Sequence, residues 1–223
     1  MDEKLVIFGA TEQAILSHFC FTHDSPHEVV AFTVNRAYLT ENTLCGLPIV
    51  PFEDIESIYP PGEFKMHVAT LFGRVNKTRA EKYDEAKAKG YELISYISSK
   101  AITWPGLVVG DNCFIWGNAA FQPFVKIGSN VIIADGCVIE HHSVIKDHCF
   151  LAAHAVVLGG VTIEPFCFLG ANSTIRNDVV IAKECVIGAG ALILEDTQEG
   201  NVYKGRPGEL LPRRSDELNP GLK

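Results

Sequence analysis

The sequence predicts a small Rossmann-like α/β unit followed by a left-handed parallel β-helix of about five coils. Two observations lead to this fold class. The first is a six-residue repeat that runs without interruption from Leu107 to Asp196. The second is a β-α-β pattern in the N-terminal part, where the repeat is absent. We therefore expect the α/β domain over residues 1–98, the β-helix over residues 99–196, and a C-terminal segment over residues 197–223.

The repeat gives each of its six positions a structural role. Cut into hexads, it reads LVVGDN, CFIWGN, AAFQPF, VKIGSN, VIIADG, CVIEHH, SVIKDH, CFLAAH, AVVLGG, VTIEPF, CFLGAN, STIRND, VVIAKE, CVIGAG, ALILED. Position three is apolar throughout, position one is Ala, Ser, Cys, Val or Leu, and position six is mostly Asn, Gly, Asp or His. A period of six fits neither an α-helix nor a plain strand, but three hexads can form one triangular coil. Positions one and three then point inward, and position six lies at a turn with positive φ.

Composition and charge limit the classes of function. The 223 residues carry a formal net charge of −8, which argues against nucleic acids and anionic membranes as partners. No apolar run approaches the ~20 residues of a membrane-spanning helix, and the first residues do not form a signal peptide. We therefore expect a cytoplasmic protein.

The cysteines predict packing rather than metal binding. Five of the seven occupy position one of a hexad: Cys113, Cys137, Cys149, Cys167 and Cys185. Position one points inward, and thiols in a reducing compartment pack there as small hydrophobic side chains. The sequence has no Cys-x-x-Cys pair, so we expect no metal site.

The N-terminal part reads as a strand over Leu5–Phe8, a helix over Glu12–Phe21 and a second strand over Glu28–Val34. The turn after the first strand, Gly9-Ala10-Thr11, is placed to meet a phosphate at the start of the helix. Only one glycine of a Gly-x-Gly-x-x-Gly pattern is present, so a simple tight turn is an equal alternative. Further along, Asn76 is expected to cap a helix.

One histidine stands apart from the others of the repeat. His142, His148 and His154 occupy position six on three different sides of the coil, where they serve as turn residues and cannot cluster within one protomer. His141 occupies position five and points outward, and Gly159 lies one coil later on the same side. An exposed imidazole beside a bare glycine backbone is suited to act as a base next to an acyl group.

Three short motifs accompany the α/β unit and the hexads: Asn76-Lys77-x-Arg79, Glu140-His141 and Gly205-x-Pro207. Together these features resemble those of a known family, the bacterial sugar acyltransferases of the PglD/NeuD type, over nearly the whole chain. The resemblance implies a homotrimer that moves an acetyl group from acetyl-CoA to an amino or hydroxyl group of a nucleotide-linked sugar, for surface glycan biosynthesis, without a metal.

The resemblance also implies roles for single residues. His141 matches the family's catalytic base, and Gly159 matches the glycine whose backbone amide meets the thioester. Glu140 and His142 are candidates to orient the base, because His142 stands where the family often has an acidic residue. The residues that match the CoA groove are Gly170, Ala171, Gly188 and Ala189, followed by Lys204, Gly205, Arg206 and Pro207. Those expected to bind the nucleotide sugar are Gly9, Ala10, Thr11, Asn35 and Arg36.

Three departures from the family pattern bear on the substrate. Phe150 stands where the family often has a second histidine that contacts acetyl-CoA. Thr11-Glu12 replaces small residues at the phosphate turn, and Asn35-Arg36 replaces the usual acidic residues after the second strand. The last two weaken the case for a uridine diphosphate sugar more than the case for acetyl transfer.

Two other classes of function stay open. A γ-type carbonic anhydrase is built on the same solenoid, but it needs three imidazoles that converge on zinc across an interface. A non-catalytic solenoid that serves as a binding module is the other. The sequence predicts neither which sugar or nucleotide is used nor whether nitrogen or oxygen is acetylated.

Overall fold

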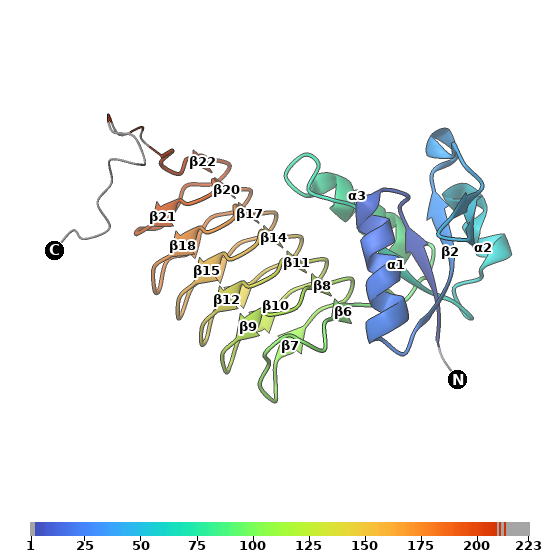
Figure 1. Ribbon diagram of the computed structural model, residues 1–223, viewed down its shortest axis with the longest axis horizontal. Coiled ribbons are helices and arrows are strands. Elements are labelled where there is room, and N and C mark those ends of the chain that lie inside the picture. Colours follow the sequence, from blue (N-terminus) through green and yellow to red (C-terminus); the bar gives the residue numbers. More distant parts are fainter. Residues whose placement is uncertain (1–2, 209, 211, 213–223) are drawn as a thin grey trace.

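The computed structural model describes residues 3–208, 210 and 212, and it consists of an α/β unit joined to a triangular β-helix (Figure 1). The predicted fold class is confirmed. Among the described residues, no helix has the length and apolar character needed to cross a membrane.

The α/β unit is built on a sheet in the order β3-β4-β2-β1-β5, in which only β3 runs antiparallel to its neighbour. Both faces of the sheet are covered, which is why its central strands are almost wholly apolar. Leu5 and Ile7 pack with Phe21 of α1 on one face, while Val6 and Met66 pack with other residues on the opposite face. The elements are β1 (Lys4–Phe8), α1 (Glu12–Asp24), β2 (Glu28–Val34), η1 (Arg36–Tyr38), β3 (Thr43–Leu44), β4 (Leu47–Pro51), η2 (Phe52–Asp54), α2 (Ile55–Ile58), β5 (Lys65–Val68) and α3 (Lys77–Ala88).

The β-helix has three flat sides made of two-residue parallel strands. Side one contains β7 (Val108–Val109), β10 (Lys126–Ile127), β13 (Val144–Ile145), β16 (Thr162–Ile163) and β19 (Val180–Ile181). Side two contains β6 (Tyr96–Ile97), β8 (Phe114–Ile115), β11 (Ile132–Ile133), β14 (Phe150–Leu151), β17 (Phe168–Leu169), β20 (Val186–Ile187) and β22 (Val202–Tyr203). Side three contains β9 (Ala120–Phe121), β12 (Val138–Ile139), β15 (Val156–Val157), β18 (Thr174–Ile175) and β21 (Leu192–Ile193).

We call the turns between sides one and two the first corner, those between sides two and three the second corner, and those between sides three and one the third corner. Position six of every hexad from Asn112 to Gly190 lies at one of these corners with φ between 53° and 73°. This includes Phe124, Phe166 and Glu184, which are not typical left-handed residues. The stacking of the coils therefore imposes the turn conformation even where the side chain does not favour it.

The interior of the β-helix is filled by positions one and three, as predicted. The thiols and hydroxyls of position one also form hydrogen bonds between neighbouring coils. The Cys149 thiol donates to the carbonyl oxygen of Glu164 on the next coil at 3.2 Å, and the Ser143 hydroxyl donates to that of Leu158 at 2.8 Å. Burial raises the pKa of the Cys113 thiol to about 12, so it stays protonated and able to donate.

The coils begin before the hexad pattern becomes visible in the sequence. β6 already pairs with β8 on side two, and Ile102 bridges to Ala120 on side three. The Ser95 hydroxyl donates to the carbonyl oxygen of Gly110. Ser143 makes the equivalent hydrogen bond to Leu158 on a later coil of the β-helix. A partial coil therefore precedes β7 and connects the α/β unit directly to the solenoid.

The α/β unit is fastened to the solenoid by buried polar groups of α3. Arg79 is 1% exposed, and its guanidinium donates to the carbonyl oxygens of Asn130, His148 and Cys149 at successive first-corner turns. Burial without a carboxylate partner lowers the pKa of Arg79 to about 10. The expected capping role of Asn76 is wrong, because its side chain makes no cap hydrogen bond to α3 and its amide instead donates to the Cys167 carbonyl, on the solenoid, at 3.0 Å.

Candidate functional site

His141 lies at the third corner, between β12 and β13, with its side chain exposed. Its Nδ1 is 3.2 Å from Nδ1 of His142, and its backbone N–H donates to Oε1 of Gln122 on the coil below. One of the two Nδ1 atoms must donate in this pair. When His141 is the donor, its Nε2 has a free lone pair and can accept a proton.

Gly159 lies directly against the His141 ring. A Cβ atom at this position would be 2.5 Å from Cε1 and 2.8 Å from Nε2 of His141, so any side chain would displace the imidazole. The glycine is thus needed to let the ring lie across the coil above it.

The Glu140 carboxylate is hydrogen-bonded to the backbone amide of Gly159 and not to the candidate base. Its Oε2 accepts the Gly159 N–H at 3.1 Å. The side chain that hydrogen-bonds the His141 ring is that of His142, which packs in turn on Phe124 with ring centroids 4.8 Å apart. Of the two expected orienting residues, only His142 lies in the position to orient His141.

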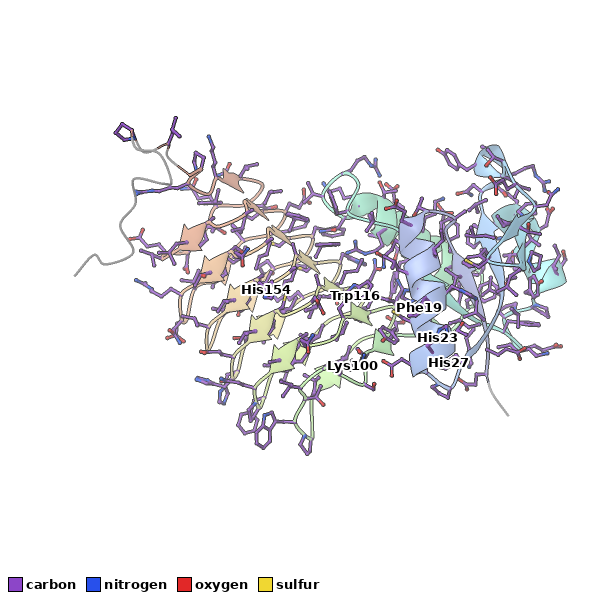
Figure 2. All side chains as sticks on the ribbon, viewed as in Figure 1. Phe19, His23, His27, Lys100, Trp116 and His154 are labelled. Atoms are coloured by element: carbon purple, nitrogen blue, oxygen red, sulfur yellow. The ribbon has the colours of Figure 1, made fainter. Side chains whose placement is uncertain are left out.

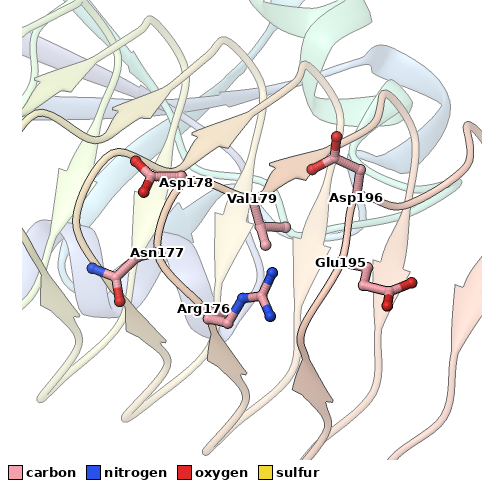
Figure 3. Close-up of a pocket in the computed structure, with 6 residues that line it drawn as sticks. All are labelled: Arg176, Asn177, Asp178, Val179, Glu195 and Asp196. Atoms are coloured by element: carbon pink, nitrogen blue, oxygen red, sulfur yellow. The ribbon is translucent and has the colours of Figure 1, made fainter.

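Two further residues at this corner, Gln122 and Arg176, were not predicted from the sequence. Gln122 was visible in principle, because it occupies position four one coil below Glu140. Higher at the same corner, Arg176 lines a cavity of about 670 Å³ together with Asn177, Asp178, Val179, Glu195 and Asp196 (Figure 3). Asn177 lies in the same column as His141 and Gly159, so this cavity continues the corner away from the histidines.

The residues expected to bind CoA lie at the second corner and are stacked backbone to backbone. A Cβ on Gly170 would lie 2.5 Å from the Ala189 nitrogen, and one on Gly188 would lie 3.1 Å from the Gly205 nitrogen. Pairing of β20 with β22 brings Lys204 and Gly205 onto this corner. Close stacking alone is enough to require these glycines. The exposed Arg206 follows, and residues 209, 211 and 213–223 of the expected C-terminal segment lie outside the described residues.

Within one protomer, the two groups of candidate residues do not meet. His141 and Gly159 lie at the third corner, whereas Gly170, Ala171, Gly188 and Ala189 lie at the second, with the width of side three between them. The outward residues of side three are uncharged, and all except Thr174 are apolar: Ala120, Val138, Val156, Thr174 and Leu192.

The expected sugar-binding residues of the α/β unit lie together with one exception. Gly9, Ala10, Thr11 and Asn35 line a cavity of about 390 Å³ that also includes Tyr38, Thr40, Thr70, Thr78 and Lys82. Gly9 has φ of 129°, and a Cβ there would be 2.8 Å from the carbonyl oxygen of Ala69.

Arg36 is the exception. Its guanidinium donates to Asp54 at 2.6 Å, and its backbone N–H donates to Glu53, so the side chain is held away from the cavity. Lys82 lines the cavity instead, with its ammonium group bound to the Glu85 carboxylate at 2.8 Å.

The remaining histidines of the repeat lie at the other corners. His148 is packed under Phe166 at the first corner, where its Nδ1 is 2.9 Å from Nδ2 of Asn130, and burial lowers its pKa. His154 lies against Gly136 at the second corner. In the described part of the chain, no group of three or more His, Cys, Asp or Glu side chains is arranged to hold a metal ion.

The profile of the bacterial transferase hexapeptide family (six repeats) matches residues 106–141, 125–159, 142–177 and 160–195. Residues 106–195 are bacterial transferase hexapeptide repeats. The repeat family expected from the sequence is thereby confirmed. No curated protein sequence matches the chain significantly.

Solved structures share the fold of both the α/β unit and the hexapeptide region. The acetyltransferase domain of PglB from Neisseria gonorrhoeae FA1090 superposes with a TM-score of 0.83 at 22% identity, covering 94% of this chain and 100% of that one. The same domain in complex with acetyl coenzyme A gives 0.82 at 19% identity, covering 95% and 100%. PerB from Caulobacter crescentus, in complex with CoA and GDP-perosamine, gives 0.79 at 21% identity, covering 91% and 94%.

Proposed function

We propose that this chain is an acetyltransferase that moves the acetyl group of acetyl-CoA to an amino group of a nucleotide-linked sugar, with a hydroxyl group as the second choice of acceptor. The observation that carries the proposal is the exposed His141 imidazole lying across Gly159 at the corner of a hexapeptide β-helix. The similar structures that contain acetyl coenzyme A, or CoA with GDP-perosamine, support the choice of substrates.

We place the site between protomers of a homotrimer. If side three of each β-helix faces a common three-fold axis, the second corner of one protomer meets the third corner of the next. His141 of one copy then lies opposite the glycine-rich corner at Gly170 and Gly188 of its neighbour. The apolar outer row of side three supports this arrangement, because such a flat face is buried in stable assemblies.

The chemistry needs a base and a donor to the developing oxyanion. The neutral amine attacks the thioester carbonyl carbon, the C–S bond breaks, and the amine proton passes to Nε2 of His141. The CoA thiolate then takes up a proton and leaves as the thiol. The Gly159 N–H can stabilise the oxyanion once Glu140 releases it, and the cavity at Gly9–Thr11 would hold the nucleotide with Lys82 beside the diphosphate.

Mass spectrometry of the protein incubated with acetyl-CoA and a panel of UDP- and GDP-linked 3-amino and 4-amino sugars tests this function. We expect one sugar to gain one acetyl group, with release of one CoA for each acetyl transferred. A panel that stays unmodified while acetyl-CoA binds the protein would contradict the proposal. Hydroxyl acceptors form the second panel, and transfer to one of them would establish O-acetylation.

A further inference from the structure

We propose that a cavity between α1 and the first coils binds the pyranose ring of the acceptor, with Phe19 and Trp116 as the stacking surfaces. This inference rests on the proposed function and assigns its sugar subsite. The cavity measures about 490 Å³, and its lining includes Phe19, Asp24, Lys100, Trp116, Asn118 and Asp135. Figure 2 shows Phe19 on α1 beside Trp116 of the first coil.

Both aromatic side chains line the cavity and are fixed from behind by other rings. Phe19 is 59% exposed and lies flat on His23, with ring centroids 4.2 Å apart and an angle of 23° between the planes. Trp116 is held by the edge of Phe114 at 5.2 Å. Trp116 is half-buried and packs partly on the core, so the part of its ring that lines the cavity lies opposite the exposed ring of Phe19. An exposed aromatic ring on the wall of a cleft marks a binding surface.

Trp116 is also exceptional in its own column. It occupies position four at the second corner, where the later coils have Ala134, Ala152, Gly170 and Gly188. The column therefore has small side chains next to the candidate CoA groove and a large ring at its N-terminal end. A pyranose presents apolar C–H groups on its faces, and these fit against the flat ring of a Trp or Phe side chain.

Polar groups around the cavity match the hydroxyl and amino groups of a sugar. Lys100, Asn118 and Asp135 are exposed, and Lys100 and Asp135 take part in no ion pair among the described residues. Asp24 is fixed by the Ser99 backbone N–H at 2.9 Å and the Tyr96 hydroxyl at 2.7 Å. Hydrogen bonds from Ser99 and Tyr96 lower the pKa of Asp24 to about 2, so a charged acceptor group is permanently present.

The position of the cavity agrees with the proposed route of transfer. Asp135 and His141 belong to the same coil, at the second and third corners respectively, so a three-fold arrangement brings the His141 of a neighbour to the level of the cavity. Along α1, residues 12, 16, 19 and 23 share one face and lead from the Gly9–Thr11 turn to Phe19. Residues 12 to 19 span about 10 Å, so the cavity lies two helical turns from the turn that is proposed to bind the nucleotide.

The two tryptophans of the chain, Trp104 and Trp116, make the assignment directly measurable. In the Trp104→Phe variant, Trp116 is the single indole and its fluorescence reports on the cavity. We expect UDP- or GDP-linked amino sugars to change this fluorescence at saturation, whereas UDP and GDP alone leave it unchanged. A response to the nucleotides equal to that of the nucleotide sugars, or no response to any sugar of the panel, overturns the assignment.

Kinetics of surface variants give the second test. Phe19→Ala, which removes an exposed ring from a stable helix face, is expected to raise the KM for the acceptor sugar at least tenfold and to leave the KM for acetyl-CoA unchanged. Ile15→Ala is the matched control, since Ile15 is 40% exposed on the same helix and does not line the cavity. An unchanged acceptor KM in Phe19→Ala and Trp116→Ala would refute the subsite. Fluorescence binding without acetyl transfer would instead refute the proposed function alone.

Discussion

A histidine and a glycine on adjacent coils carry the proposed chemistry. The His141 ring lies across Gly159, so the imidazole and the backbone amide are placed next to one another by the coil spacing alone. Glu140 holds that amide through its carboxylate, which implies that binding of a thioester must displace Glu140 before the amide can donate to it.

Replacing His141 by Ala should lower kcat by about 10²–10⁴ if the imidazole is the general base. The fold should stay intact, because the side chain is exposed. His142→Ala should have a smaller effect on kcat without weakening acetyl-CoA binding, since His142 only contacts the base. Steady-state kinetics at saturating substrates and circular dichroism provide the measurements. Full activity of His141→Ala would show that another group accepts the proton.

Stability should depend on pH through the buried His67. Burial lowers its pKa to about 4, and its Nδ1 is 2.9 Å from the Ile94 carbonyl oxygen. The unfolded imidazole takes up a proton near pH 6.5, whereas the folded one does so only near pH 4. The free energy of unfolding should therefore fall as the pH drops from 6.5 to 4.

Urea denaturation at a series of pH values measures this effect. His67→Phe should show a shallower loss of stability over the same range, by about 1.4 kcal/mol per pH unit. Replacement of the exposed His23 by Phe is the control. If the free energy of unfolding depends on pH equally in the wild type and in His67→Phe, His67 is not the group responsible.

Sequence reasoning reached His141 and the turn positions because both follow from the six-residue period. It could not reach the pairing of Glu140 with Gly159, since the choice between neighbouring partners depends on side-chain rotamers. The Phe19–Trp116 cavity was also invisible, because α1 meets the first coil only through the tertiary packing of the two units.

At the scale of elements, each coil is held to the next by bonds that the hexad pattern alone does not reveal. Thiols and hydroxyls at position one donate to carbonyl oxygens one coil above, as Cys149 and Ser143 show. The pattern predicted small inward side chains but not this role, because Ala and Val serve equally well in the same position.

Cys149→Ala should lower the free energy of unfolding by about 1–2 kcal/mol, through the lost thiol contact and a small cavity. Cys149→Ser should lose less, because a hydroxyl can keep the bond to Glu164. The exposed Cys45→Ala is the control. Chemical denaturation measures stability, and calorimetry should show unchanged acetyl-CoA affinity. Loss of that affinity in the Ala variant would refute a purely structural role.

The junction between the α/β unit and the solenoid depends on Arg79. Arg79→Met should destabilise the protein by roughly 2–3 kcal/mol, because the carbonyl oxygens of Asn130, His148 and Cys149 lose their buried donor. Arg74→Met, at an exposed position on the preceding loop, should cost less than about 0.5 kcal/mol. Thermal unfolding of both variants measures the difference. Equal melting temperatures would exclude Arg79 as the fastening residue.

At the scale of the whole molecule, the candidate base and the candidate CoA groove lie at two corners separated by side three. The structure reveals this separation, although the sequence columns contain it, because positions eighteen residues apart stack on the same corner. The six-residue period does not predict the assembly that would bring the two corners together. That assembly depends on how the surfaces of side three match one another.

We expect a homotrimer, and analytical ultracentrifugation measures its mass. Leu192 is 62% exposed in the outer row of side three, so Leu192→Asp should weaken the trimer and lower activity together. Lys126→Asp on side one is the control and should leave the trimer unchanged. A fully active monomer would contradict the shared site.

Co-expression of two inactive variants tests the central claim most directly. His141→Ala removes the base, and Ala171→Phe blocks the neighbouring groove at the second corner. In random mixtures of equal amounts, three of every four trimers are mixed and each mixed trimer has one intact site, so about a quarter of wild-type acetyl transfer should return. Recovery to this level would show that the base and the groove come from different protomers. Absence of recovery, with mixed trimers verified by mass spectrometry, would show that they do not form one site.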